Sequence, residues 1–153
     1  MLKTGQKAPD FNLLDEKGES VTLNDFRNQK VILYFYPKDD TPGCTTQACS
    51  YRDHFDEFVK RGYQIVGISK DDVKSHQKFL TKYGLNFTLL SDPDTTVIQA
   101  YDCWKEKSLY GKKYMGTART TFVLDAEQTI LKVFENVDPK GDVQQVLAFI
   151  DSL

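Results

Sequence analysis

The feature that most constrains the fold is the run Val31–Tyr36, six consecutive apolar residues that end at Pro37. A strand that is apolar on both faces is typical of the centre of a sheet that is covered on both sides. Tyr63–Ile68 is a second, largely apolar run of the same kind. The sequence therefore predicts a buried central sheet with further layers on its two faces.

Helical and extended patterns alternate around these two strands. The expected order is a hairpin of Phe11–Leu14 and Val21–Leu23, the strand 31–36, a helix over Pro42–Arg61, the strand 63–68, a helix over Asp72–Tyr83, a strand at Phe87–Leu90, a short helix over Thr95–Tyr101, a hairpin of Thr121–Leu124 and Ile130–Phe134, and a last helix containing Val143–Ile150. In the longest helix, the expected inward stripe is Tyr51, Phe55, Phe58 and Val59. This order predicts an α/β three-layer sandwich around a mixed sheet, in one continuous domain over residues 1–153.

Composition limits the classes of partner that we expect for the protein. The 153 residues carry 20 basic and 22 acidic side chains, a formal charge of −2 at pH 7, which argues against nucleic acid or an anionic membrane as a partner. We interpret the basic aromatic stretch Trp104–Tyr114 as a packed loop with solvated lysines. The apolar runs are too short to cross a bilayer, and the first residues lack the apolar core of a secretion signal. With three cysteines, too few for a secreted disulfide scaffold, we expect a cytoplasmic protein.

The segment that joins the first buried strand to the next helix is the most informative part of the chain. Thr41 suits the N-cap of that helix and Pro42 its first position, so Cys44 is expected in the first turn. Unpaired backbone N–H groups and the positive end of the helix dipole favour a thiolate there. Asp39 and Asp40 act in the opposite direction, because nearby negative charge raises a thiol pKa. The site is therefore expected to need an added cation.

Cys49 follows Cys44 by five residues, and helix geometry limits what the pair can do. Positions i and i+5 of an ideal helix have Cα atoms about 8.7 Å apart, beyond the ~7 Å that a disulfide spans without backbone movement. Bonding the two sulfurs would require the first turns of the helix to unwind. We therefore hypothesise a folded reduced state and a locally unfolded oxidised state.

Spacing alone leaves other interpretations open. Cys44 and Cys49 could be two small buried apolar residues, which is what free cysteine usually is. Four residues separate them, so a thioredoxin-type C-x-x-C motif is absent. Cys44, Cys49 and His54 step by about 140° around a helix and cannot converge on one ion, so no metal site is expected. His54 and His76 are interpreted as surface or helix-packing residues.

The run Tyr34–Asp53 resembles the active-site signature of the peroxiredoxins. The pattern P-x-x-x-T-x-x-C is met by Pro37, Thr41 and Cys44, and Cys49 matches the resolving cysteine of the bacterioferritin comigratory protein, or PrxQ, branch. Two further stretches agree with that branch: Trp104–Gly116 and Arg119–Asp125. The resemblance covers nearly the whole chain and implies a thioredoxin-like fold.

The resemblance also implies a reaction, the reduction of hydrogen peroxide and organic hydroperoxides without a metal or organic cofactor. Cys44 would become a sulfenic acid, Cys49 would resolve it as an intramolecular disulfide, and thioredoxin or a similar dithiol would reduce the disulfide. Arg119 matches the family's active-site arginine and would supply the missing cation. The Thr41 hydroxyl would help to orient the peroxide, and Pro37 would shape and shield the pocket. These implications describe a thioredoxin-dependent, atypical two-cysteine peroxidase that acts as a monomer.

Two other functions remain candidates at this point. A noncatalytic thiol redox sensor or holdase would use Cys44 and Cys49 to sense oxidation without turnover, and a general disulfide oxidoreductase would act on protein disulfides without peroxide. Cys103 lies outside the two matched cysteine positions. It is interpreted as a buried packing residue, a second resolving thiol or a site of intermolecular bonding.

Overall fold

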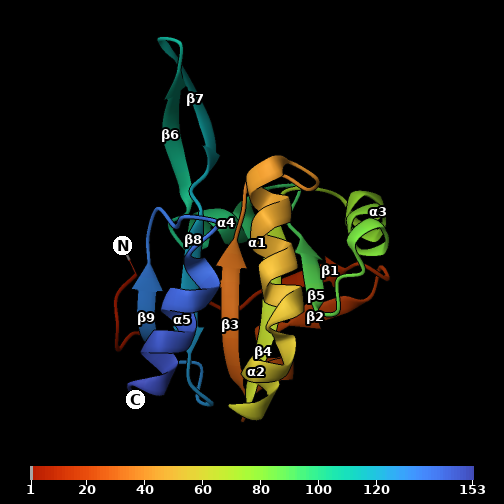
Figure 1. Ribbon diagram of the computed structural model, residues 1–153. Helices are drawn as coiled ribbons and strands as arrows, with labels where there is room; N and C mark the ends of the chain where they lie inside the picture. Colours follow the sequence, from red (N-terminus) through yellow and green to blue (C-terminus); the bar gives the residue numbers. More distant parts are fainter. Residues whose placement is uncertain (1) are drawn as a thin grey trace.

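A seven-stranded mixed sheet with helices on both faces forms the body of the protein (Figure 1). The computed structural model describes residues 2–153. The elements are β1 (Asn12–Asp15), β2 (Ser20–Thr22), a 3₁₀ helix η1 (Leu23–Phe26), β3 (Lys30–Phe35), α1 (Pro42–Asp53), α2 (Phe55–Lys60), β4 (Tyr63–Ser69), α3 (Val73–Tyr83), β5 (Thr88–Ser91), α4 (Thr96–Ala100), β6 (Trp104–Leu109), β7 (Lys112–Thr117), β8 (Thr120–Leu124), β9 (Ile130–Phe134) and α5 (Asp142–Asp151). The strand order in the large sheet is β2-β1-β5-β4-β3-β8-β9.

The central strand β3 builds both halves of the core. Because successive side chains of a strand point to opposite faces, Ile32 and Tyr34 join the core under α1, α2, α3 and α5. Leu33 and Phe35 join the core on the other face, to which α4 contributes. Figure 1 shows α1, α2 and α5 in front of the sheet and α4 behind it. The prediction of a three-layer α/β fold with a mixed sheet and an N-terminal hairpin, here β1 and β2, is confirmed.

Pairing across β3 decides which distant segments meet. β3 runs parallel to β4 and antiparallel to β8. In the antiparallel pair, Phe35 at the end of β3 lies opposite Thr120 at the start of β8. Arg119, directly before β8, is therefore placed at the edge of the sheet where β3 ends and the chain turns into α1.

The prediction of a single helix over Pro42–Arg61 is wrong in one respect, because the helix is interrupted at His54. α1 ends at Asp53, and α2 begins at Phe55. The break resets the helical phase, so Val59 is 50% exposed and does not continue the inward stripe, whereas Phe58 is fully buried. Within residues 2–153, none of the helices is both long and apolar enough to cross a membrane.

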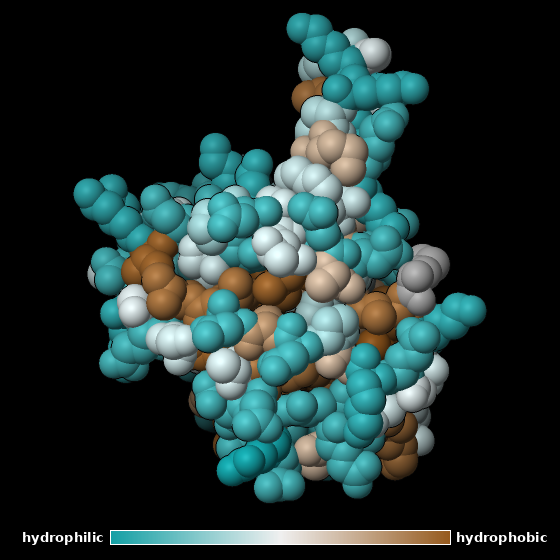
Figure 2. All heavy atoms as spheres, turned by 180° about the vertical axis from the view of Figure 1, so that it is seen from behind, coloured by the Kyte–Doolittle hydropathy of each residue, from teal (hydrophilic) through white to brown (hydrophobic). Residues whose placement is uncertain are grey.

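The stretch Trp104–Tyr114 corrects a second prediction. β6 and β7 pair as an antiparallel hairpin that projects from the body, and its surface is largely hydrophilic (Figures 1 and 2). Tyr110 and Gly111 at its tip both have positive φ, as a tight two-residue connection requires, and Tyr110 is 96% exposed. Lysines interrupt any apolar alternation in these strands, which is why the sequence suggested a packed loop instead.

Candidate active site

Cys44 occupies the third position of α1 and is almost fully buried, with 2% of its surface exposed. As expected, Thr41 is the N-cap residue and Pro42 the first helical residue. The Thr41 side chain makes no capping hydrogen bond, and its hydroxyl instead donates to the Lys38 carbonyl at 2.9 Å. A hydroxyl oxygen that donates its proton in this way keeps lone pairs that can accept a hydrogen bond.

Arg119 is the cation beside the sulfur. Its Nη1 donates to Cys44 Sγ at 3.4 Å and to Gln47 Oε1 at 2.8 Å. Gly43 makes this approach possible, because a Cβ at that position would lie 3.1 Å from Arg119 Nη2. The structure thus brings together two residues that are 75 positions apart in the chain, and the cation expected beside Cys44 is a guanidinium at the first turn of α1.

A buried carboxylate lies behind this pair. Asp142, at the first position of α5, has no exposed surface, and its Oδ2 accepts hydrogen bonds from three side chains. The donors are Gln47 Nε2 at 2.9 Å, Tyr51 OH at 2.6 Å and Thr121 Oγ1 at 2.9 Å. Because the amide nitrogen of Gln47 faces this carboxylate, its carbonyl oxygen faces Arg119. The network therefore fixes the guanidinium from behind.

The phenol of Tyr51 remains a donor in this network. Burial and then the nearby charge of Asp142 raise the pKa of Tyr51 well above its ordinary value. Sequence reasoning missed Gln47, Tyr51 and Asp142 as parts of the site. One signal was available, since a glutamine three residues after Cys44 falls on the same face of the helix and is a polar side chain among apolar ones.

Cys49 lies on the same continuous helix as Cys44 and is partly buried, and both cysteines are free thiols. The structure is therefore the dithiol form. The first turn of α1 is held by the backbone bond from Thr45 N to Thr41 O at 2.8 Å and by the hydroxyl of Thr46, which donates to Pro42 O at 2.9 Å. Both bonds belong to the turns that have to open before the two sulfurs can meet.

Pro37 follows the end of β3 and is partly buried at the start of the segment that leads to Cys44. Of the five residues singled out from the sequence, the structure joins Cys44 and Arg119 directly and places Thr41 at the N-cap of the same helix. Within residues 2–153, no three His, Cys, Asp or Glu side chains are grouped so that they could hold a metal ion.

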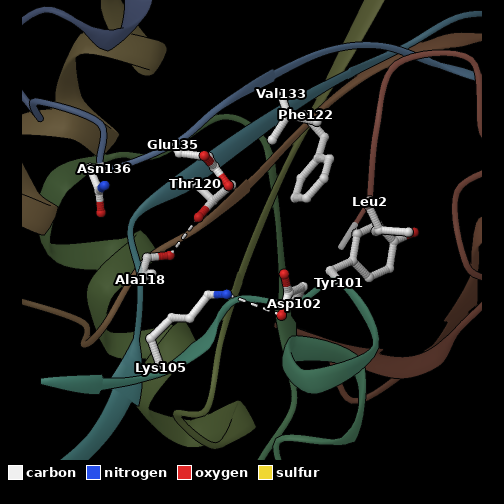
Figure 3. A pocket seen from close by; sticks show the side chains of 10 residues that line it. All are labelled: Leu2, Tyr101, Asp102, Lys105, Ala118, Thr120, Phe122, Val133, Glu135 and Asn136. Atoms are coloured by element: carbon white, nitrogen blue, oxygen red, sulfur yellow. Dashed lines mark hydrogen bonds and ion pairs between the residues drawn. The ribbon is translucent and has the colours of Figure 1, made fainter.

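Cys103 lies in the core on the opposite face of the sheet from Cys44. It is fully buried, its Sγ donates to the Tyr101 carbonyl at 3.3 Å, and burial raises its pKa to about 12. A pocket of about 270 Å³ lies beside this segment (Figure 3), and its lining consists of Leu2, Tyr101, Asp102, Lys105, Ala118, Thr120, Phe122, Val133, Glu135 and Asn136. Neither Cys44 nor Arg119 lines it. Cys103 is thus a packing residue in this structure.

A buried thiol at a helix N-terminus, with a guanidinium against its sulfur, is typical of a thiol-dependent oxidoreductase. The sequence matches the AhpC/TSA family over residues 4–133. It is 51% identical to the putative peroxiredoxin bcp of Coxiella burnetii over 95% of this chain and 97% of that protein. The fold matches a cysteine-to-serine variant of PrxQ from Xylella fastidiosa with a TM-score of 0.94, at 31% identity, over 99% of this chain and 97% of that one.

A further solved structure that matches the fold comes from a protein with a studied activity. The bacterioferritin comigratory protein of Xanthomonas campestris, which was studied for its alkyl peroxide reduction, matches with a TM-score of 0.88 at 38% identity, over 93% of this chain and 90% of that one. The chain belongs to the AhpC/TSA family, within the Bcp, or PrxQ, peroxiredoxins. It is a peroxidase that takes a peroxide as substrate and a thiol as reductant. The relatives do not favour a noncatalytic redox sensor or holdase.

Proposed function

We propose that Cys44 is the nucleophile of the peroxidase and that Arg119 holds the peroxide against it. The Cys44 thiolate attacks one peroxide oxygen and the O–O bond breaks, so that the sulfur becomes a sulfenic acid. The other oxygen takes up a proton and leaves as water or an alcohol. Arg119 offsets the charge that moves onto the leaving oxygen, and the Cys44 N–H and the Thr41 hydroxyl orient the substrate. Pro37 shields the sulfur from bulk water.

Cys49 completes the cycle in this proposal. Its thiolate attacks the Cys44 sulfur and the S–O bond breaks, so that an intramolecular disulfide forms and the leaving hydroxide takes up a proton to become water. This step requires the first turns of α1 to unwind, since both cysteines lie on one intact helix in the dithiol form. Thioredoxin then reduces the disulfide by exchange of its own dithiol. The enzyme is proposed to act as a monomer in the cytoplasm, where dithiol reductants are kept reduced.

One contact supports the proposal most directly. Arg119 Nη1 lies 3.4 Å from Cys44 Sγ, at the N-terminal turn of α1. A thiolate is stabilised at that point both by the helix terminus and by a cation. The other two cysteines have no equivalent placement, because Cys49 lies further along α1 and Cys103 lies in an apolar core.

The test is hydrogen peroxide consumption coupled to thioredoxin and its reductase, with three matched serine variants. Cys44→Ser is expected to abolish turnover, and Cys103→Ser is expected to leave it unchanged. Cys49→Ser is expected to lose thioredoxin-supported turnover while one round of Cys44 oxidation survives. Full turnover in Cys49→Ser would remove that residue from the role proposed for it.

A further inference from the structure

A second buried charged cluster lies on the other side of the segment that leads to Cys44. His76 of α3 has no exposed surface, and its Nδ1 lies 2.6 Å from Asp39 Oδ2. Its Nε2 lies 2.9 Å from the Leu90 carbonyl oxygen. Two hydroxyls also donate to the buried Asp39 carboxylate, Tyr36 OH at 2.6 Å and Ser75 Oγ at 2.8 Å. The peroxidase mechanism above uses none of these contacts.

The partners of His76 determine its charge. A carboxylate and a carbonyl can only accept hydrogen bonds, so both ring nitrogens donate when the two contacts are made, and the ring is an imidazolium. Burial acts to lower the pKa of His76, but the hydrogen bond and charge of Asp39, the Leu90 carbonyl and the charge of Asp71 outweigh it and raise the pKa. The hydroxyl of Tyr36, the residue directly after β3, also faces Asp39. Asp39 and His76 together form a buried ion pair.

The neighbouring aspartate is held by the same helix in a different way. Asp40, at a φ of +56°, accepts hydrogen bonds from Lys82 Nζ at 2.9 Å and Tyr83 OH at 2.6 Å, both in α3. This second contact is exposed to solvent, where an ion pair contributes little. α3 thus contacts two successive residues of one segment, Asp39 through a buried pair and Asp40 through exposed contacts.

We propose that His76 is a positioning residue of the peroxidase site. Its imidazolium neutralises the Asp39 carboxylate, so that this group, two residues before the N-cap of α1, carries no uncompensated negative charge near Cys44. The inference rests on the proposed role of Cys44 as the nucleophile.

The charge of His76 has an effect on Cys44 that is separate from the effect of its shape. Without the imidazolium, the Asp39 carboxylate would keep two hydroxyl donors but no cation, five residues before Cys44 in the chain. A negative charge near a thiol disfavours the thiolate. Removing the Asp39 carboxylate as well should then restore the reactivity of Cys44. Reactivity that was lost through poorer packing or anchoring would not be restored.

The experiment measures how fast iodoacetamide alkylates Cys44 as a function of pH, resolved by peptide mass spectrometry, in the full-length reduced protein. His76→Gln keeps a hydrogen-bond donor but no charge, and at about pH 6 it is expected to slow the alkylation of Cys44 about tenfold. Asp39→Asn is expected to react no more slowly than wild type. The double variant is expected to return to within about threefold of wild type.

A structural role predicts another pattern, in which Asp39→Asn slows Cys44 as much as His76→Gln and the double variant is no faster than either. That pattern would overturn the proposal. Lys82→Gln is the matched control, because it removes from the same helix an exposed cation that pairs with the next aspartate, Asp40. The alkylation rate of Cys44 is expected to change by less than about twofold in this variant. If His76→Gln fails to fold, Asp39→Asn still decides, since slower alkylation in that variant contradicts the charge role.

The same samples separate this inference from the proposed function. One equivalent of hydrogen peroxide is added to each, and oxidation of Cys44 is followed in a single turnover. If wild-type Cys44 does not react, the proposed nucleophile is wrong. If it reacts and His76→Gln matches wild type in both readouts, Cys44 remains the nucleophile and the role proposed for His76 is wrong.

Discussion

Two of the three cysteines, Cys44 and Cys103, are buried almost equally, yet their chemical surroundings differ. Cys44 lies at the start of α1 with the guanidinium of Arg119 against its sulfur. Cys103 lies on the far face of the sheet, where its thiol donates to the Tyr101 carbonyl and burial raises its pKa to about 12. Burial alone therefore does not make a cysteine reactive or inert. In the proposed mechanism, a helix terminus and a cation make Cys44 the cysteine that reacts.

The largest effect should separate these two cysteines directly. Cys44→Ser should lower peroxidase turnover by about 10³-fold or more, because the nucleophile is lost. Cys103→Ser should stay within about twofold of wild type. Steady-state peroxide consumption measures both. A large loss of activity in a well-folded Cys103→Ser variant would contradict the distinction drawn between the two cysteines.

The cation gives the next largest effect. Arg119→Ala should slow the single-turnover reaction with peroxide by about 10²-fold, since charge on the sulfur and on the leaving oxygen loses its partner. Reduction of the preformed disulfide by thioredoxin should change little. Arg119→Lys is the control that keeps the charge without the planar fork, and it should recover part of the rate. Equal slowing of both half-reactions would remove Arg119 from the peroxide step.

The hydrogen-bond network behind Arg119 extends the comparison to the free energy of unfolding. Tyr51→Phe removes a buried donor to Asp142 and should lower the free energy of unfolding by ~1–3 kcal/mol. Tyr83→Phe removes a hydrogen bond of the same length to the exposed Asp40 and should cost less than about 0.5 kcal/mol. Urea unfolding measures both. Equal losses would mean that burial of the carboxylate does not strengthen the bond.

The smallest effect is a pH dependence. The folded state raises the pKa of His76 above its ordinary value of 6.5. The stability that its proton contributes is therefore complete below about pH 6.5 and is lost as pH rises through the folded-state pKa. The difference in free energy of unfolding between wild type and His76→Gln should narrow over that rise. A difference that grows with pH would show that His76 is neutral in the folded protein.

Local patterns in the sequence predicted most of the architecture. Two apolar runs identified the central strands β3 and β4, and the chain order of the other elements followed from periodicity. The match of Pro37, Thr41 and Cys44 to a known signature indicated the candidate site, whose role stays a proposal. The break at His54 and the projecting β6–β7 hairpin were missed, because neither a helix end without a cap signal nor a strand rich in lysine has a clear local pattern.

The parts of the site that the sequence did not reveal all depend on tertiary structure. Gln47 meets Asp142 across 95 residues, and Asp39 meets His76 across 37. No local spacing encodes either contact, since the first requires the fold to place α1 against α5 and the second requires it to place α3 against the segment before α1. A buried ion pair also looks like two ordinary surface residues until the fold removes water from both.

The most direct test of the account is to map the first oxidation event. Fully reduced protein is mixed with one equivalent of hydrogen peroxide, the remaining thiols are blocked, and peptides are analysed by mass spectrometry. The proposed mechanism predicts a disulfide between Cys44 and Cys49, with Cys103 recovered as a blocked thiol. A dominant bond between Cys44 and Cys103, or oxidation of Cys103 while Cys44 stays reduced, would contradict it.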